Sequence, residues 1–205
     1  SRVYYGEMAD PWVVVGARGG AEPVELDTPG GGSAAAGTET MTTYAGRGGV
    51  AIGNPVLRTM YATQMADINL LLSDRVHSNS KILYDRKPRD RVAKVAPWLT
   101  VDSDSLPAVV DGRMVWIVDG YTTSSDYPNS TKVDLRDAAS DSTTGNRVAQ
   151  RGTEINYIRN SVKAVVDAYD GTVQLYAWQP DDPILQTWQK VYPGTVKPRS
   201  AMSKD

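Results

Sequence analysis

Cysteine and phenylalanine are absent from the 205 residues, and histidine occurs once, as His77. Without cysteine the chain has no disulfide framework, no thiolate zinc ligand and no cysteine nucleophile. A serine hydrolase would need His77 as its base, but His77 lies in a polar run after an expected helix, a position typical of a surface loop. Because phenylalanine is missing, tryptophan and tyrosine must supply the aromatic packing.

An excess of one charge and a long apolar run are also missing. The 22 basic and 24 acidic residues give a net charge of −2, so no general attraction to nucleic acid is expected. No apolar run reaches the ~18 residues that a membrane-spanning helix needs. The chain starts at Ser1 without a signal peptide and enters strand-like sequence directly. We therefore expect residues 1–205 to be one domain excised from a longer protein.

Two β-hairpins are the clearest structural signals. Over residues 162–168, small apolar residues alternate with larger or polar ones, which is the period of a half-buried strand. Asp170-Gly171 then predicts a tight type I′ turn, and the alternation resumes at Val173. A shorter hairpin over residues 108–118 is predicted to turn at Asp111-Gly112.

Three amphipathic helices are predicted to accompany the hairpins, starting near Pro55, Pro88 and Pro183. The first is expected to bury a stripe made of Leu57, Met60, Tyr61, Ile68, Leu71 and Leu72. Short strands are expected over residues 2–5, 12–15 and 81–84. Residues 19–43, rich in glycine and alanine, and residues 124–153, rich in serine and aspartate, are predicted to be flexible insertions. Hairpins without regular βαβ alternation indicate an α+β fold with a mainly antiparallel sheet.

A glycine-rich segment, residues 45–54, leads toward the first helix. Backbone N–H groups at Gly48 and Gly49, together with the side chain of Arg47, would suit a phosphate or carboxylate there. The glycine spacing matches neither the Walker nor the dinucleotide motif. The alternative is a tight loop whose glycines permit close packing.

Lys87, Arg91 and Lys94 fall on one face of the second predicted helix. This face is a candidate contact for anionic lipid headgroups or an anionic envelope polymer. The alternative is an ordinary solvated helix face.

The segment 120–128 follows a predicted strand and concentrates hydroxyl and phenol groups. Tyr121, Thr122 and Asp126 are its candidate ligand residues, suited to a sugar or peptide in a shallow groove, and an ordinary polar loop is the alternative. Asp119, Asp126 and Asp167 are the candidates for carboxylate catalysis, which requires two carboxyl groups close in space. The acidic runs at 102–104 and 180–183 lack the ligand spacing of a calcium loop, so no metal or cofactor is expected.

Several segments, taken in order, resemble one family of large bacterial integral membrane proteins, uncharacterised protein family 0182. They are residues 2–7, 44–50, 67–73, 89–99, 110–123, 156–176 and 180–185. The resemblance implies a region outside the cytoplasm that follows several N-terminal transmembrane helices. It implies no activity, cofactor or catalytic residue.

These observations favour a non-catalytic, extracytoplasmic interaction module of a multi-pass membrane protein, on the outer side of the plasma membrane. Its expected partners are the remainder of its own chain and, as a further option, an envelope polymer or another envelope protein. A carboxylate-dependent envelope hydrolase or transferase is the first alternative. Binding of an anionic ligand or lipid headgroup is the second.

Overall fold

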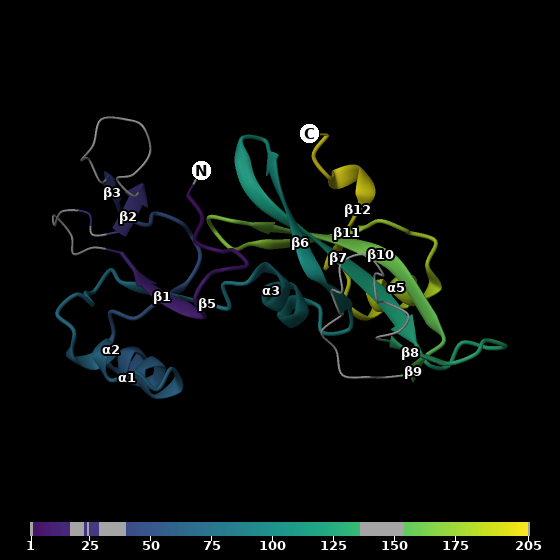
Figure 1. Cartoon of the computed structure of the whole chain (residues 1–205), viewed down its shortest axis with the longest axis horizontal. Coiled ribbons are helices and arrows are strands. Elements are labelled where there is room, and N and C mark those ends of the chain that lie inside the picture. Colours follow the sequence, from purple (N-terminus) through teal and green to yellow (C-terminus); the bar gives the residue numbers. More distant parts are fainter. Residues whose placement is uncertain (1, 17–22, 24, 29–39, 136–153, 205) are drawn as a thin grey trace. The chain divides into compact units, whose positions relative to one another are not determined.

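The computed structural model describes residues 2–16, 23, 25–28, 40–135 and 154–204, drawn in colour in Figure 1. These residues divide into two compact units. One unit contains Val3–Ala9 and Arg86–Asp205, and the other contains Asp10–Asp85. Both are built from mainly antiparallel strands with helices packed on them, which confirms the α+β prediction. Most of the two predicted flexible insertions lies outside the described residues. Their described parts include strands at 25–28, 40–42 and 133–134.

The unit of Asp10–Asp85 contains a three-stranded sheet in the order β1-β5-β4, with all neighbours antiparallel. Its elements are β1 (Trp12–Val15), β4 (Val50–Ala51), β5 (Lys81–Tyr84), α1 (Pro55–Gln64) and α2 (Asn69–Leu72), with β2 (Glu25–Thr28) and β3 (Thr40–Thr42) forming a separate pair. Ile52, Ala62, Leu70 and Ile82 form the core between the helices and the sheet. The strands predicted at 12–15 and 81–84 are therefore confirmed.

Helix α1 begins where the sequence predicts. The Asn54 side chain accepts a hydrogen bond from the Val56 N–H at 2.8 Å, and Pro55 occupies the first helical position. The helix ends at Gln64, and Ala66 has a positive φ of 52° before α2 starts. This break changes the helical phase, so the single buried stripe predicted through residue 72 is wrong. Ala62 and Leu70 are buried instead.

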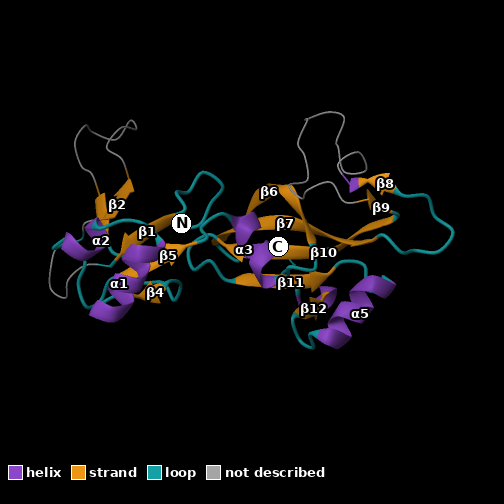
Figure 2. Cartoon of the chain, turned by 90° about the horizontal axis from the view of Figure 1, so that it is seen from below, coloured by secondary structure: helices purple, strands orange, loops and turns teal. Residues whose placement is uncertain are grey.

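The unit of Val3–Ala9 and Arg86–Asp205 contains a five-stranded sheet in the order β12-β11-β10-β7-β6. Its elements are α3 (Pro88–Val95), β6 (Thr100–Val110), β7 (Arg113–Ser124), β8 (Val133–Asp134), β9 (Glu154–Ile155), β10 (Tyr157–Asp167), β11 (Val173–Ala177), α5 (Pro183–Val191), β12 (Val196–Pro198) and the 3-10 turn η1 (Arg199–Ala201). Among the described strands of this unit, β11 and β12 form the one parallel pair. Figure 2 shows the sheet with α3 and α5 beside it.

Helices α3 and α5 pack against the same face of this sheet. Val92 and Ala96 from α3 and its end, and Leu185 from α5, share one core with inward residues of β7, β10 and β11. A short helix resting on a sheet buries only a narrow stripe. Val95, Val191 and Tyr192 are therefore exposed. No helix within the described ranges is both long and apolar enough to cross a membrane.

The β6–β7 hairpin turns as predicted: Asp111 and Gly112 both have positive φ, 50° and 71°. The long hairpin is confirmed as a pair of strands, with Val162, Ala164, Val166 and Ala168 buried. Its predicted type I′ turn is wrong, because β10 already ends at Asp167 and only Gly171 has a positive φ. The Asp167 carboxylate accepts the N–H groups of Tyr169 and Asp170, both at 2.8 Å, and so shapes a wider turn.

No strand forms over residues 2–5, although one was predicted there. The N–H groups of Tyr4 and Tyr5 instead both donate to the Ala168 carbonyl, at 2.8 and 2.9 Å, beside the wide turn. Further along this segment, Glu7 accepts hydrogen bonds from the N–H and hydroxyl of Ser105, on the edge strand β6, at 3.0 and 2.6 Å. The segment therefore braces the edge of the sheet without joining it.

Candidate functional site

A β-bulge in β10 organises the polar side chains of the larger unit. Asn160 pairs with Tyr121 and Val162 pairs with Gly120, so Ser161 is an extra residue on β10. Ser161 and Val162 consequently both face the side of α3 and α5. Asn160 and Lys163 both face the other side, which we call the open face. The bulge thus contributes to one polar cluster on each face of the sheet.

The cluster on the open face is centred on Asp119 of β7. Its carboxylate accepts Lys163 Nζ at 2.5 Å on one oxygen and Asn160 Nδ2 at 2.7 Å on the other. The Lys163 ammonium also lies 5.5 Å from the ring centroid of Trp178. The Asn160 Oδ1 atom is buried and has no hydrogen-bond partner among the described residues. We call Asp119, Asn160 and Lys163 the Asp119 cluster.

Tyr121 lies next to the Asp119 cluster and donates its hydroxyl to Asp102 Oδ2 at 3.0 Å. Burial raises the pKa of Tyr121, and the negative charges of Asp102 and Asp119 raise it further. The phenol therefore stays protonated well above neutral pH. In this setting it acts as a hydrogen-bond donor, with no capacity to serve as a base.

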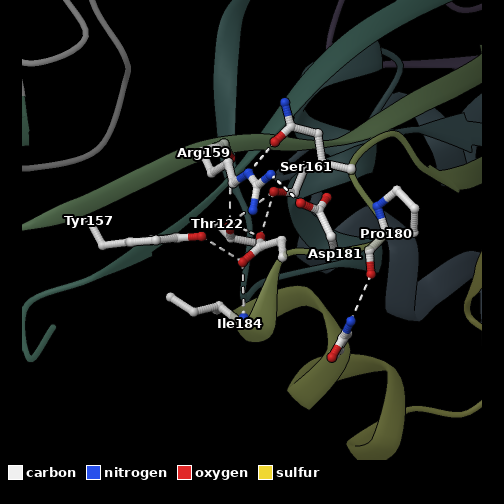
Figure 3. Close-up of polar contacts among 10 residues, drawn as sticks. Thr122, Tyr157, Arg159, Ser161, Pro180, Asp181 and Ile184 are labelled. Atoms are coloured by element: carbon white, nitrogen blue, oxygen red, sulfur yellow. Dashed lines mark hydrogen bonds and ion pairs between the residues drawn. The ribbon is translucent and has the colours of Figure 1, made fainter.

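The opposite face carries a second carboxylate centre, at Asp182 (Figure 3). Thr122 and Ser161 donate to Asp182 Oδ2, both at 2.5 Å, while the Tyr157 hydroxyl and the Ile184 N–H donate to Oδ1 at 2.8 and 3.0 Å. Asp182 is fully buried and is the N-cap of α5. Four donors occupy the carboxylate, so it ties α5 to the sheet and leaves little room for a substrate.

Opposing effects set the pKa of Asp182. Burial by itself raises it, but the hydrogen bonds from Ser161, Thr122, Tyr157 and the Ile184 N–H outweigh burial, so the pKa lies below its ordinary value. The carboxylate is ionised at neutral pH. It is a structural anion held by donors, which differs from the raised pKa expected of a catalytic acid.

The structure does not bring the predicted ligand residues Tyr121, Thr122 and Asp126 into one groove. Tyr121 and Thr122 are neighbours on β7 and point to opposite faces of the sheet. Asp126 follows the end of β7, is exposed, and donates its N–H to the Ser124 hydroxyl at 3.1 Å. Of the three, only Tyr121 lies beside the Asp119 cluster.

The three carboxylates predicted for catalysis also have separate surroundings. Asp119 is engaged by Lys163 and Asn160, as described above. Asp167 shapes the turn after β10 and pairs with Arg113 at 2.9 Å. Asp126 is exposed at the end of β7.

The glycine-rich segment packs tightly in the smaller unit. The Gly48 N–H donates to the Tyr44 hydroxyl at 3.0 Å, which occupies one of the amides expected to hold an anion. Gly49 has a φ of 84°, and a Cβ there would lie 2.4 Å from the Leu83 side chain. These contacts match the packing alternative for the glycines. Strand β4 lies within this segment, between Gly49 and α1, and Arg47 is exposed. Anion binding at Arg47 stays a prediction.

The three cations of α3 differ in their surroundings. Lys87 and Lys94 are exposed. Arg91 donates to the Gly171 carbonyl at 2.6 Å, and its guanidinium lies 4.6 Å from the Tyr5 ring centroid. Arg91 therefore holds the wide turn in place, and contact of this helix with an anionic surface stays a prediction.

Sequence reasoning missed an apolar surface on α1 and α2, because it predicted five of its six residues, all except Val56, to be buried. The exposed side chains, which we call the α1–α2 surface, are Val56, Leu57, Met60, Ile68, Leu71 and Leu72. Met60 is 62%, Ile68 65% and Leu72 73% exposed. The available signal was Asp67, whose carboxylate accepts the Asn69 N–H at 2.8 Å and so marks a new helix start.

Arg58 fixes the two helices that carry this surface. Its guanidinium donates to the carbonyls of Leu71 and Ser73, both at 2.8 Å, and also to the Leu70 carbonyl. These carbonyls lie at the C-terminal end of α2, where a positive charge is favourable. The α1–α2 surface is therefore held in a defined shape.

Comparison with known proteins shows the family. The chain belongs to the Uncharacterised protein family (UPF0182), whose sequence profile matches residues 1–205. It is 54% identical over 206 residues to a UPF0182 protein of Frankia alni, covering 99% of this chain and 19% of that protein. It is 52% identical to one of Paenarthrobacter aurescens and 51% identical to one of Leifsonia xyli, covering 100% and 98% of this chain and 20% of each relative.

The family resemblance is therefore confirmed. The chain spans about a fifth of the length of the curated relatives it matches. No solved structure matches it.

Proposed function

We propose that this chain is a non-catalytic interaction module of a longer, multi-pass bacterial membrane protein, on the extracytoplasmic side of the plasma membrane. The α1–α2 surface carries the proposal, and its partner is the remainder of the same protein. The membrane setting and the side of the membrane rest on the family resemblance.

The α1–α2 surface has the composition of a contact surface. Six large apolar side chains on one helix pair are exposed. Exposed apolar residues are common singly, whereas a group of this kind on one element marks an interaction site. Full burial of each such side chain stabilises a contact by roughly 1.5–3 kcal/mol. Because Arg58 already orders the helix pair, little conformational entropy remains to be lost on docking.

The length of the relatives supports the rest of the chain as the partner. Relatives at 51–54% identity are about five times as long as the matched region. A segment joined covalently to its partner meets that partner at a high effective concentration, so a modest apolar surface suffices for stable contact. A separate envelope protein or polymer would have to supply more binding energy to reach the same occupancy.

The carboxylate hydrolase alternative has less support from the geometry. Such an enzyme needs two carboxyl groups facing a bound substrate. The carboxylate of Asp182 has four donors, and both oxygens of Asp119 accept side-chain hydrogen bonds. The oxygens of both carboxylates are therefore already occupied by hydrogen bonds from neighbouring residues.

The test compares a substitution on the α1–α2 surface with a control substitution, in the full-length protein and in the isolated chain. Met60→Asp places a charge on the α1–α2 surface, and Leu106→Asp makes the same kind of change at a 67% exposed position of β6. In the full-length membrane protein, Met60→Asp should increase protease cleavage around α1, while Leu106→Asp should not. In the isolated 205-residue chain neither change should matter, because both side chains already face solvent.

Equal protease resistance of the full-length wild type and Met60→Asp would overturn the proposed docking. Equal sensitivity of the variant in the full-length protein and in the isolated chain would show that Met60 acts within the unit itself. Either result would refute the docking of the α1–α2 surface on which the proposed function rests.

A further inference from the structure

The helices that cover the five-stranded sheet carry a group of aromatic side chains that the proposed function does not use. Trp98, which follows α3, stacks on Trp188 of α5, with ring centroids 5.4 Å apart and 18° between the ring planes. Trp188 also stacks on Tyr192, just after α5, at 5.9 Å and 6°. We call Trp98, Trp188 and Tyr192 the aromatic array. It joins the C-terminal ends of the two helices.

The aromatic array reaches the surface while the core anchors it. Trp98 is partly buried and packs against the core that α3 and α5 share with the sheet. Trp188 is also partly buried, whereas Tyr192 is 47% exposed. Close to these rings in the chain, Val95 is 48% and Val191 54% exposed. Apolar and aromatic side chains grouped in this way mark a contact surface, unlike a single exposed residue.

The polar atoms of the two tryptophans remain available to a partner. Within the described residues, neither indole N–H donates to an acceptor, and neither nitrogen is sealed from solvent. A ring that is apolar over most of its surface and carries one exposed donor suits a boundary between an apolar phase and water. The headgroup region of a bilayer is such a boundary, and tryptophan and tyrosine are enriched there.

The charges that accompany the aromatic array are positive. Lys94 lies in the last turn of α3 and Lys190 in the last turn of α5, and both side chains are exposed. The segments that carry the array, residues 91–101 and 183–204, contain no acidic residue. Lysine near an anionic membrane lays its stem along the apolar surface and keeps its ammonium among the lipid phosphates. The charge of this surface is therefore complementary to that of an anionic bilayer.

Two other kinds of partner fit the same surface less well. The core of a protein–protein interface is depleted in lysine, whereas here a lysine accompanies the apolar side chains at each helix end. A sugar would stack on the flat face of an aromatic ring. In the aromatic array the rings stack on one another, which occupies faces that a sugar would need.

We propose that the aromatic array contacts the headgroup region of an anionic lipid bilayer, with Val95 and Val191 beside it and with Lys94 and Lys190 at the lipid phosphates. This inference rests on the proposed function for its membrane setting. It uses the larger unit of the chain, whereas the α1–α2 surface belongs to the smaller one.

The test uses the full-length protein in nanodiscs of phosphatidylcholine and phosphatidylglycerol, with an environment-sensitive fluorescent amino acid at position 191. Lipids that carry bromine close to the headgroup should quench this probe, because bromine quenches only at contact. The same probe at position 106, which is 67% exposed on β6, should keep its emission. Leaving out phosphatidylglycerol should reduce the quenching at position 191.

A pair of substitutions tests the array itself. Tyr192→Asp places a negative charge among the rings and should restore most of the emission of the probe at position 191. Leu106→Asp, the matched control on β6, should leave the quenching as it is in the wild type. Circular dichroism of both variants shows whether they are folded.

Four results would overturn the proposal. The first is a probe at position 191 that bromine does not quench, including one with blue-shifted emission, which would show that protein covers the array. The second is equal quenching at positions 191 and 106. The third is unchanged quenching in a folded Tyr192→Asp variant, and the fourth is unchanged quenching without phosphatidylglycerol. The protease test of Met60→Asp involves none of these positions, so this inference and the proposed function fail separately.

Discussion

Replacing Asp182 tests whether a buried carboxylate holds α5 to the sheet. Asp182→Ala removes the helix N-cap, which costs roughly 1 kcal/mol. It also leaves three hydroxyl donors without their acceptor, and each buried unsatisfied group costs roughly 1–3 kcal/mol. Thr122 and Ser161 lie 3.3 Å apart and recover part of this loss by bonding to each other. We therefore expect the free energy of unfolding to fall by about 3 kcal/mol.

Asp182→Asn removes the negative charge of the side chain and keeps its shape. The amide oxygen keeps the cap to Ile184, and the hydroxyls of Thr122 and Ser161 rotate to accept from the amide nitrogen. Only the charge-assisted part of the hydrogen bonds is lost, and we expect a loss of about 1–2 kcal/mol. Urea unfolding of the 205-residue chain at pH 7, followed by tryptophan fluorescence, measures both variants.

The pH dependence of stability tests the direction of the pKa shift of Asp182. The pKa of Asp182 in the folded chain lies below its ordinary value, which is about 3.9 when unfolded. Its contribution to stability is therefore complete above pH ~4 and is lost as the pH falls through the folded value. The stability difference between wild type and Asp182→Asn should be constant near neutrality and shrink in acid. Asp181→Asn, at the exposed neighbour, should change little.

Two results would refute this reasoning. If Asp182→Asn matches the wild type at pH 7, the carboxylate charge contributes nothing to the fold. If the difference between them grows below pH 4, the sign of the pKa shift is wrong.

Three further predictions concern the backbone and the edges of the fold. Gly171→Ala should destabilise the chain by more than Gly112→Ala in thermal melts, because a Cβ at Gly171 would lie 2.5 Å from the Tyr5 ring whereas Gly112 has open space at a similar φ; equal effects would contradict this. Arg58→Lys should speed amide exchange in α2 and residues 73–76 while leaving the larger unit unchanged, since lysine cannot bridge several carbonyls. Pro107→Val restores an N–H on the outer edge of β6 and should produce concentration-dependent association in light scattering; a monodisperse variant would show that the edge is protected by other means.

The hairpins were predictable because strand alternation and Asp-Gly turns are local signals. At Asp111-Gly112 the local signal decided the structure: both residues have positive φ, and a Cβ at Gly112 would meet nothing within 4 Å. At Asp170-Gly171 the same dipeptide gave a wider turn, because Asp167 captures two backbone N–H groups and Tyr5 packs against Gly171. The contact of Tyr5 with Gly171 joins residues far apart in the sequence, so periodicity alone could not reveal it.

The candidate sites were less predictable than the fold. Asp119 and Tyr121 were identified as candidate site residues just after a predicted strand. The bulge that brings Asn160 and Lys163 to Asp119, however, depends on the pairing of β10 with β7. The α1–α2 surface was missed because helical spacing reports which residues share a face, and it does not report whether that face is covered. The break at Ala66, which has a positive φ, separates α1 from α2 and leaves these side chains exposed.

The central claim is that the α1–α2 surface docks against the remainder of the same protein. A photo-crosslinking amino acid at position 60 of the full-length protein, activated in its native membrane, tests this claim directly. The account predicts an intramolecular cross-link from α1 to a peptide outside residues 1–205, with none from the same probe at position 106. A full-length protein that shows no such cross-link at position 60, or cross-links there only to other proteins, would contradict it.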